Sequence, residues 1–526
     1  MKELVFHRQF LPAIERWSDK IGFHDGAYHA SFAEHGERVL RLAHAMKHQL
    51  GLRRGDRFAV MACNSHQYLE LYHAGQLGAG VINPLNLRLA GAELQHVLRD
   101  SGTSVVFVDQ VFADHFARNI ADIRSQLSLR HVVLIGDETV GGADATHDIR
   151  YEDLIAGAES VVPDEPDETD PAVLMYTGGT TGRAKGVLLD QRAQILNFYH
   201  IGLAVDFADT RVYLHQTPMF HAASMPGVIG ITATGGTSIF VPLFEPQQVM
   251  QAIEQYSVDW TVMVPTMIAL LMNHPQFHPD RLASVRDLVY GASPMPAPLL
   301  DRIVASLPNV KLWQGYGMTE CSAILTLLTA ADHAQGGARL RSAGRPAIGV
   351  TISVRHPDDT VAAVGENGEI CAQAGNFMQG YWNQPEQTEE AFRGGWYHTG
   401  DEGYLDSDGY LYLVDRVKDM IVTGGENVYS IEVENAIATH PAVEQVAVIG
   451  IPHAVWGEQV HAIVVLQAGS SATEDEIQQH ARQTIAGYKV PKSVEFRTEP
   501  IPLSGALKPL KRELRKPYWQ EQPDDG

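Results

Sequence analysis

Apolar and polar positions along the chain alternate with two different periods. Between Ser31 and Gly51 apolar residues recur every three or four positions, which predicts a helix, and Ser31 and Glu34 have the spacing of an N-terminal capping box. The apolar run 58–62 follows and predicts a strand. The alternation continues through 67–79, 92–99, 105–109 and 132–135. This order predicts α/β layers around a largely parallel sheet.

A second series of alternating elements follows the midpoint of the chain. Its predicted strands lie at 238–242, 261–265, 288–291 and 310–313, and its predicted helices at 246–256 and 298–306. This series indicates a second α/β lobe. Beyond Gly344 the pattern changes to short strands and turns, which indicates a small antiparallel β unit.

The last part of the chain has a compact α+β pattern, with strands near 447–450, 463–466 and 494–496. The change of pattern places a domain boundary near Arg416. We therefore predict an α/β protein with a large, multi-lobed N-terminal domain, residues 1–416, and a small α+β C-terminal domain, residues 417–526.

Composition and charge narrow the class of protein. A chain of 526 residues with 45% hydrophobic composition is expected to fold into two or more domains. The net charge of -23 argues against general binding to nucleic acid, because a polyanionic backbone demands a basic surface. Three distant cysteines, Cys63, Cys321 and Cys371, support neither a disulfide framework nor a cysteine zinc site. With no apolar run long enough for export or a membrane span, we expect a cytoplasmic protein; peripheral membrane contact stays open.

A loop rich in glycine and threonine separates two apolar runs between Ala172 and Leu189. Its sequence is Thr177-Gly178-Gly179-Thr180-Thr181-Gly182-Arg183-Ala184-Lys185-Gly186. Glycines let several backbone N–H groups converge on one anion, threonine hydroxyls add donors, and Lys185 adds a positive charge. The loop therefore predicts a phosphate-binding site. Because Gly186 and an apolar run follow the lysine, it is not a Walker loop and is expected to join two strands.

This loop resembles the signature of the adenylate-forming superfamily of acyl-CoA synthetases, luciferases and carrier-loading adenylation domains. Gly178 stands where serine is usual and Ala184 where proline is usual, so one hydroxyl and one fixed φ angle are lost. Further motifs occur in the family's order and extend the resemblance over nearly the whole chain. There is no HExxH, GxSxG or GxGxxG motif, which removes the zinc peptidase, α/β-hydrolase and standard dinucleotide-binding classes.

The segment 314–320 follows a predicted strand, at whose carboxyl end α/β sheets bind ligands. The resemblance implies that Tyr316 stacks on adenine, that Thr319 meets the α-phosphate and that Glu320 coordinates Mg²⁺. It also implies that Asp401 and Arg416 hold the ribose hydroxyls. The full ATP-binding set implied is Thr177, Gly178, Gly179, Thr180, Thr181, Gly182, Lys185, Gly291, Ala292, Ser293, Gln314, Gly315, Tyr316, Gly317, Thr319, Asp401 and Arg416.

The resemblance implies that the C-terminal domain, residues 417–526, is mobile. It implies that Lys418 is a hinge, that Gly424 and Gly425 line the CoA tunnel, and that Lys508 enters the site as a catalytic lysine. Leu507 replaces the glycine that usually precedes this lysine. The catalytic set implied is Lys508, Glu320, Thr319 and Lys185.

The implied activity is that of an ATP-dependent acyl-CoA synthetase, with ATP, Mg²⁺ and CoA as ligands and an acyl-adenylate as intermediate. The candidate acyl pocket comprises Phe220, His221, Met225, Thr266 and Ser322. Its surroundings carry no charge to pair with a second carboxylate or an amine, which favours an apolar fatty or alicyclic acid ahead of an aromatic one.

Three alternatives stay open at this point. The chain could be an aryl-acid CoA ligase, a stand-alone adenylation enzyme that loads a carrier protein, or a catalytically degenerate nucleotide-binding protein. Retention of Lys185, Glu320, Asp401, Arg416 and Lys508 argues against the last of these. Assembly as a homodimer also stays open.

Overall fold

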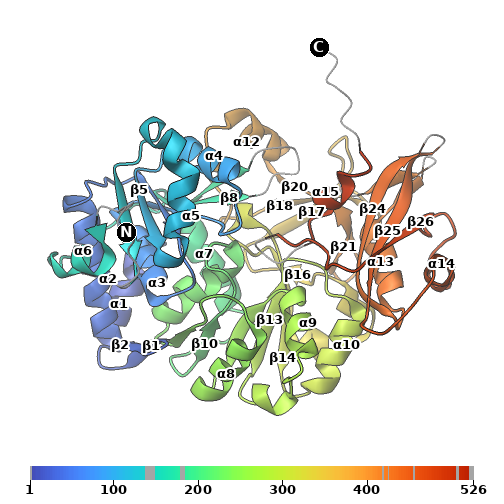
Figure 1. Cartoon of the computed structure of the whole chain (residues 1–526), viewed down its shortest axis with the longest axis horizontal. Coiled ribbons are helices and arrows are strands. Elements are labelled where there is room, and N and C mark those ends of the chain that lie inside the picture. Colours follow the sequence, from blue (N-terminus) through green and yellow to red (C-terminus); the bar gives the residue numbers. More distant parts are fainter. Residues whose placement is uncertain are drawn as a thin grey trace.

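The structure is a computed structural model that describes residues 3–136, 149–177, 184–416, 420–423, 426–453, 456–504 and 509–519. Four β-sheets organise the described part of the chain (Figure 1). Two of them are large and mainly parallel, and two are small and mainly antiparallel. The predicted α/β class is confirmed.

The first large sheet has the order β19-β9-β8-β4-β3-β5-β6-β7. Its strands are β3 (Arg57–Met61), β4 (Val81–Pro84), β5 (Val105–Asp109), β6 (His131–Ile135), β7 (Ile149–Arg150), β8 (Pro171–Thr177), β9 (Lys185–Asp190) and β19 (Gly380–Tyr381). The pairing is parallel from β7 to β8 and antiparallel at β9 and β19. Parallel strands need helical crossovers, which the predicted alternation of helix and strand provides.

Helices cover both faces of this sheet. They are α2 (Phe32–His48), α3 (His66–Ala74), α4 (Gly91–Ser101), α5 (Gln110–Ile120) and α6 (Tyr151–Ala156), with α1 (His7–Arg16) packed on α2. Ala59 and Met61 of β3 share a buried cluster with α4 and α5, whereas Phe58 and Val60 share another with α2 and α3. Successive residues of a strand point to opposite faces, so β3 is buried on both sides.

The second large sheet has the order β16-β15-β14-β13-β12-β10-β11-β1-β2. Its strands are β1 (Ile21–Asp25), β2 (Tyr28–Ser31), β10 (Val212–His215), β11 (Thr237–Phe240), β12 (Trp260–Met263), β13 (Asp287–Gly291), β14 (Lys311–Tyr316), β15 (Thr326–Leu328) and β16 (Arg345–Pro346). Helices α8 (Pro246–Tyr256), α9 (Pro265–Asn273) and α10 (Ala297–Ser306) pack on one face. Helix α7 (Gln191–Gly202) and the short turns η3 (Ala222–Ser224) and η4 (Pro226–Ile231) lie toward the other face.

The two small sheets complete the chain. One comprises β17 (Thr351–Arg355), β18 (Gly368–Gln373), β20 (Tyr397–Leu405) and β21 (Leu411–Arg416), all antiparallel, which confirms the predicted β unit. The other comprises β22 (Ile421–Thr423), β23 (Glu426–Val428), β24 (Val443–His453), β25 (Gly457–Leu466) and β26 (Ser493–Arg497). It lies at the right of Figure 1 with α13 (Ser430–Ala438), α14 (Glu474–Arg482) and α15 (Lys511–Arg515).

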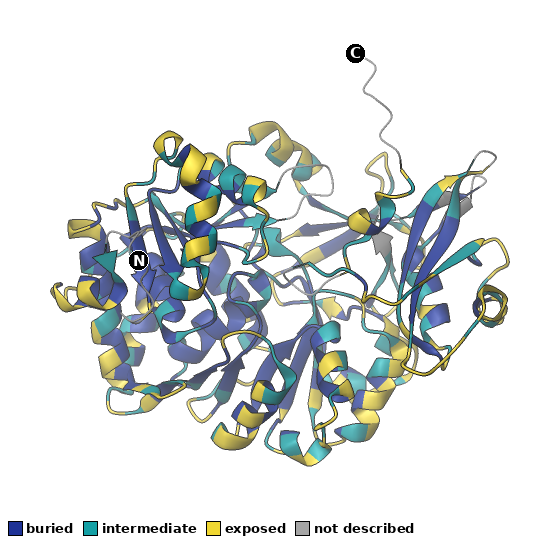
Figure 2. Cartoon of the chain, in the orientation of Figure 1, coloured by how far each residue is buried: buried dark blue, intermediate teal, exposed yellow. Residues whose placement is uncertain are grey.

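Burial follows these layers. Figure 2 shows the strands of both large sheets buried, whereas the helices around them are exposed on their outer sides. The remaining helices, α11 (Ala330–Gln335) and α12 (Pro385–Ala391), are short. Within the described ranges no helix combines the length and apolar character that a bilayer crossing requires.

The helix predicted from Ser31 is α2, and its capping box is present. The Ser31 hydroxyl accepts a hydrogen bond from the Glu34 backbone N–H at 3.2 Å, and the Glu34 carboxylate accepts one from the Ser31 N–H at 2.7 Å. Two of the orphan donors at the start of the helix are satisfied in this way.

Candidate active site

The predicted strand-to-strand loop is confirmed as the connection of the β8–β9 hairpin. Thr177 and Lys185 form the last pair before the loop, whose residues Gly178, Gly179, Thr180, Thr181 and Gly182 lie outside the described residues. Helix α4 fixes the end of the hairpin that carries the loop. The Tyr176 hydroxyl donates to Asp100 at 2.5 Å, and the His96 ring donates to the Ala184 carbonyl at 3.1 Å.

One tyrosine connects the lysine of this hairpin to the predicted metal ligand. The Lys185 ammonium lies 4.9 Å from the centre of the Tyr381 ring, and the Tyr381 hydroxyl donates to Glu320 at 3.0 Å. Burial and, secondarily, the Glu320 charge raise the pKa of Tyr381, so its hydroxyl remains a donor at neutral pH. Tyr381 therefore orients the carboxylate and offers its ring face to the cation.

Sequence reasoning did not find Tyr381. It reaches the site because β19 pairs with β9, placing Tyr381 opposite Val187. The only signal in the sequence is an aromatic residue after a glycine, which is common in strands and turns.

The segment 314–320 runs from the carboxyl end of β14 into the short turn η6 (Thr319–Cys321), which carries Thr319 and Glu320. Glycine is required at this strand end and at the neighbouring one because backbone atoms approach each other closely there. A Cβ built on Gly291 of the neighbouring strand would collide with the carbonyl oxygen of Gly315, and one on Gly317 with that of Ala323. The strand ends β13 and β14 are therefore kept free of side chains where a ligand can approach.

Two predicted nucleotide-binding residues are in direct contact. The Tyr316 hydroxyl donates to the Asp401 carboxylate at 2.8 Å. Burial, followed by the Asp401 charge, raises the pKa of Tyr316 and keeps the hydroxyl protonated. The register of β20 and β21 pairs Asp401 with Arg416, whose side chain lies outside the described part of the structure. Two motifs that lie 85 residues apart in the sequence thus meet at one place.

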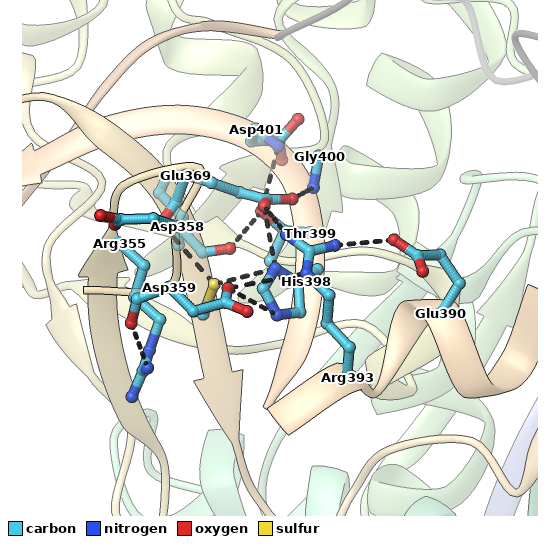
Figure 3. A network of polar contacts seen from close by, with 12 residues as sticks. Arg355, Asp358, Asp359, Glu369, Glu390, Arg393, His398, Thr399, Gly400 and Asp401 are labelled. Carbon is cyan, nitrogen blue, oxygen red and sulfur yellow. Dashed lines mark hydrogen bonds and ion pairs between the residues drawn. The ribbon is translucent and has the colours of Figure 1, made fainter. Parts of the chain in front are cut away.

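A half-buried glutamate, Glu369, fixes the turn that precedes Asp401. One oxygen of Glu369 accepts the Gly400 backbone N–H at 3.2 Å. The other accepts from the His398 ring at 2.8 Å and from the Arg393 guanidinium at 3.0 Å. Figure 3 shows this carboxylate between the three donors. Charge-assisted hydrogen bonds of this kind hold the backbone more firmly than neutral ones.

Thr399 completes the support of Asp401. Its hydroxyl donates to the Ile370 carbonyl at 2.8 Å and accepts the Asp401 N–H at 3.1 Å. The backbone of Asp401 is thereby tied to β18 as well as to its partner β21. This rigidity supports the interpretation of Asp401 as a ligand-binding residue.

The same network includes Cys371. The ligand atoms of Glu369, Cys371 and His398 lie within 4.8 Å of one another, and the thiol is 3.3 Å from the imidazole. Burial raises the pKa of Cys371 to about 12, and Arg393 already neutralises the carboxylate. Arg393 and His398 both donate to the same Glu369 oxygen, and the thiol lies against the imidazole, so these side chains form one hydrogen-bonded network.

An apolar cavity of about 120 Å³ begins at the carboxyl ends of β13 and β14. At one end it is lined by Gly291, Ala292, Gly315, Gly317 and Thr319, which belong to the predicted nucleotide site. Its remaining lining is mainly apolar: Ile201, Val205, Thr217, Pro218, His221, Ala222, Ala223, Pro226, Trp260, Val262, Met263, Val264, Met267, Val289, Tyr290, Met318, Ala323, Ile324 and Leu327.

His221 is the member of the predicted acyl pocket that lines this cavity. The structure places Phe220, Met225, Thr266 and Ser322 outside its described lining. Met225 is part of a hydrophobic core cluster, and the buried Ser322 hydroxyl accepts from Gln194 at 3.2 Å.

The apolar far part of the cavity was not predicted. It is formed by Trp260 and Val262 of β12, Val289 of β13, Ile201 of α7, and Val205, which follows that helix. The sequence shows β12 as an apolar run, but an apolar run does not reveal which face borders a cavity.

The remaining predicted residues, Lys418, Gly424, Gly425 and Lys508, lie outside the described residues. The segments that flank Lys508 are described. Leu503 forms a bridge with Pro509, and the Arg88 guanidinium donates to the carbonyls of Leu503 at 3.4 Å and Ser504 at 3.2 Å. Arg88 follows strand β4, so the first large sheet and the residues that precede Lys508 in the sequence are in contact.

Comparison with known proteins identifies the family. The model of the AMP-binding enzyme family matches residues 10–382, and that of the AMP-binding enzyme C-terminal domain matches residues 432–508. The chain belongs to the AMP-binding enzyme family, and the resemblance to the adenylate-forming enzymes is confirmed.

Among the relatives, a feruloyl-CoA synthase of Amycolatopsis sp is 39% identical over 490 residues, which cover 93% of this chain and 94% of that protein. The long-chain-fatty-acid–CoA ligase FadD13 of Mycobacterium tuberculosis is 35% identical over 474 residues, 89% of each protein. Among solved structures, ATP-bound MatB from Rhodopseudomonas palustris superimposes with a TM-score of 0.86 at 28% identity, covering 97% of this chain and 98% of that one.

Proposed function

We propose that this chain is an ATP-dependent acyl-CoA synthetase. It converts a carboxylic acid, ATP and CoA to acyl-CoA, AMP and pyrophosphate through an acyl-adenylate. The observation that carries this proposal is that Gly291, Gly315 and Thr319 line the apolar cavity and also belong to the nucleotide motifs. An acid whose tail fills the cavity would present its carboxylate where the α-phosphate binds. The relatives named as a CoA synthase and a CoA ligase support the same reaction.

The first step joins two anions, so the site must offset their repulsion and hold them in line. Lys185, Thr177 and the loop 178–182 bind the phosphates in this proposal. Thr319 contacts the α-phosphate, and Tyr316 stacks on the adenine. Asp401 and Arg416, whose backbones are paired across β20 and β21, hold the ribose hydroxyls.

Glu320 fits a divalent cation, because a carboxylate beside bound phosphates is the usual Mg²⁺ environment in proteins. When bound, Mg²⁺ would supply positive charge to the phosphates. The Tyr381 hydroxyl keeps the Glu320 carboxylate oriented toward this role. Covalent catalysis by the neighbouring cysteine is disfavoured, since burial raises the pKa of Cys321 to about 12.

The two steps require different groups beside the same adenylate. We assign the ATP- and acid-binding part to residues 1–416 and a mobile domain to residues 417–526, with Lys418 as the hinge. Lys508 would serve the adenylation step, and Gly424 with Gly425 would border the thiol path in the second step. The bulk of the acid-binding cavity lies in the first part.

A pyrophosphate-release assay over a panel of carboxylic acids, with and without CoA, tests the proposal. We expect acid-dependent pyrophosphate release together with acyl-CoA formation when CoA is present. Pyrophosphate release with an acyl-adenylate that never passes to CoA would indicate a carrier-loading enzyme. ATP binding without acid-dependent release for any acid would indicate a degenerate nucleotide-binding protein and overturn the proposal.

A further inference from the structure

The apolar cavity runs along one face of three parallel strands. The register pairs Trp260 of β12 with Asp287 of β13, and Asp287 with Lys311 of β14. Gly291 and Gly315 lie at the carboxyl ends of β13 and β14. Trp260 therefore lies at the opposite end of the cavity from the proposed site of reaction.

Trp260 is backed by other aromatic side chains. Only 1% of the residue is exposed. Its ring centre lies 4.5 Å from that of Phe207, at an angle of 73°, and 4.6 Å from that of Tyr213. These are typical spacings of packed aromatic rings. The indole cannot swing aside without displacing Phe207 or Tyr213, so it forms a fixed wall.

The distance from this wall to the strand ends sets the depth of the cavity. Gly291 lies four residues beyond the partner of Trp260, which corresponds to roughly 13 Å of strand. Its width is limited by Val262 and Val289, which are paired across β12 and β13. A straight long-chain acyl group exceeds this depth.

The size of the cavity agrees with this estimate. At about 120 Å³ it is somewhat smaller than an apolar cavity of about 150 Å³ that accommodates benzene. Ile201, Val205, Val262, Val289 and Leu327 supply apolar surface around it. A single ring or a short branched chain is of the size that fills such a space.

We propose that Trp260 closes the acid pocket and restricts the substrate to compact apolar acids, with one ring or a short chain beyond the carboxylate. Long-chain acids are excluded because their tails meet the indole. This inference rests on the proposed function, since it assigns the cavity to the acid. Aromatic acids of this size fit as well as alicyclic ones, which widens the preference drawn from the sequence.

The test compares acids of increasing length with the full-length enzyme and its Trp260→Ala and Trp260→Leu variants. The panel contains butanoic, hexanoic, decanoic and hexadecanoic acids, benzoic acid and cinnamic acid, and kcat/KM is measured by pyrophosphate release. For the parent we expect kcat/KM with hexadecanoic acid at least about tenfold below that with the best compact acid. In the variants the preference should move to longer acids, further for alanine than for leucine.

A matched control separates pocket effects from loss of stability. Leu288 is buried on β13, but it packs in the cluster on the opposite face of the sheet. Leu288→Ala should lower the melting temperature, as Trp260→Ala should, and leave the order of preference among the acids unchanged. The alanine variant at Trp260 could fail to fold. Val289→Phe therefore tests the cavity independently, because it makes the cavity smaller instead of larger. It adds volume inside the cavity and should reduce kcat/KM for ring-bearing acids relative to butanoic acid.

The outcomes distinguish the two proposals. A parent enzyme that uses hexadecanoic acid as well as hexanoic acid overturns the role of Trp260, and so does a folded Trp260→Leu variant with an unchanged length profile. In both cases the synthetase reaction still stands. A parent enzyme that releases pyrophosphate with no acid at all overturns the proposed function itself.

Discussion

At the scale of single residues, the contact between Tyr381 and Glu320 gives the site its most specific electrostatic feature. The carboxylate is oriented by a neutral hydroxyl whose raised pKa keeps it protonated, and the same ring faces the Lys185 ammonium. The negative charge of Glu320 is therefore positioned without being neutralised by this partner. A cation could still be attracted to it.

Glu320→Gln tests this role. Glutamine keeps the shape and one hydrogen-bond acceptor but removes the charge, so we expect the Mg²⁺ concentration for half-maximal pyrophosphate release to rise at least about tenfold. Tyr381→Phe is the matched control, because it removes only the hydroxyl and should shift the Mg²⁺ titration much less. Superimposable Mg²⁺ titrations of Glu320→Gln and the parent would show that Glu320 is not a ligand.

The sequence alone predicts those residues of the site that belong to a recognisable motif. Tyr316, Thr319, Glu320 and Asp401 were found from their order along the chain, and the structure brings Tyr316 and Asp401 into contact. Tyr381 could not be found in this way, because its position depends on the pairing of two strands distant in sequence. The far wall of the cavity is hidden for the same reason, since an apolar run has the same pattern beside a cavity as in a solid core.

At the scale of elements, helices α2 and α3 are joined by two buried histidines. The His35 ring donates to the Nδ1 atom of His73 at 2.9 Å, and the other nitrogen of His73 donates to the Val228 carbonyl at 2.9 Å. Phe23 stacks on His35 with ring centres 3.9 Å apart. Burial lowers the pKa of His73 to about 4 and that of His35 well below its ordinary value, so both rings are neutral in the folded protein.

The lowered pKa values of these two histidines predict that the folded protein loses stability in acid. An unfolded histidine binds a proton near pH 6.5, whereas folded His73 does so only near pH 4, so the unfolded state holds more protons between these values. The contribution of the neutral histidine to the free energy of unfolding is therefore fully present above about pH 6.5. It is lost progressively as the pH drops toward 4. Melting temperatures measured from pH 7.5 to pH 4.5 should show this decline.

His73→Gln is the informative variant for the acid sensitivity. It removes one of the two titrating rings, so the protein should be less stable at pH 7.5 but lose stability less steeply on acidification. The slope should not vanish, since burial also lowers the pKa of His35 and lowers that of His215 to about 3. Parallel pH profiles for the variant and the parent would assign the decline to other groups.

Elements with a local signal were predictable and those without one were not. Helix α8 has the bounds that its apolar period indicated, and α2 has the capping box read from Ser31 and Glu34. Strands β1 and β2 were not predicted, although β1 pairs in parallel with β11 of the second sheet. That pairing depends on long-range packing, for which a short segment of sequence carries no periodic signal.

At the scale of the whole molecule, Arg88 connects the first large sheet to the segment before Lys508. Its guanidinium donates to the carbonyls of Leu503 and Ser504, and Leu503 is bridged to Pro509. Leu503 and Ser504 are thus held beside the segment that follows β4, and Pro509 is held to Leu503. If Lys508 serves adenylation, Arg88 stabilises the arrangement that presents it.

Arg88→Ala should therefore slow adenylate formation, by up to about tenfold for the loss of one or two hydrogen bonds of an exposed charged donor. Transfer from a supplied acyl-adenylate to CoA should change little. Arg99→Ala, which removes an exposed arginine of α4 bonded only to the side chain of Gln126 among its described hydrogen bonds, is the control. Equal loss of both half-reactions in Arg88→Ala would mean that the contact supports the fold rather than one step.

The acceptors of Arg88 are uncharged backbone oxygens, and the arginine is exposed, so the contact is weak. A free-energy difference of one or two kcal/mol corresponds to a ratio of only about 5 to 30 between two populations. Between turnovers the enzyme would then exist as a mixture of arrangements, and the bound ligand would decide which predominates. Added salt should alter this mixture little, because no opposite charge pairs with Arg88 at Leu503 or Ser504.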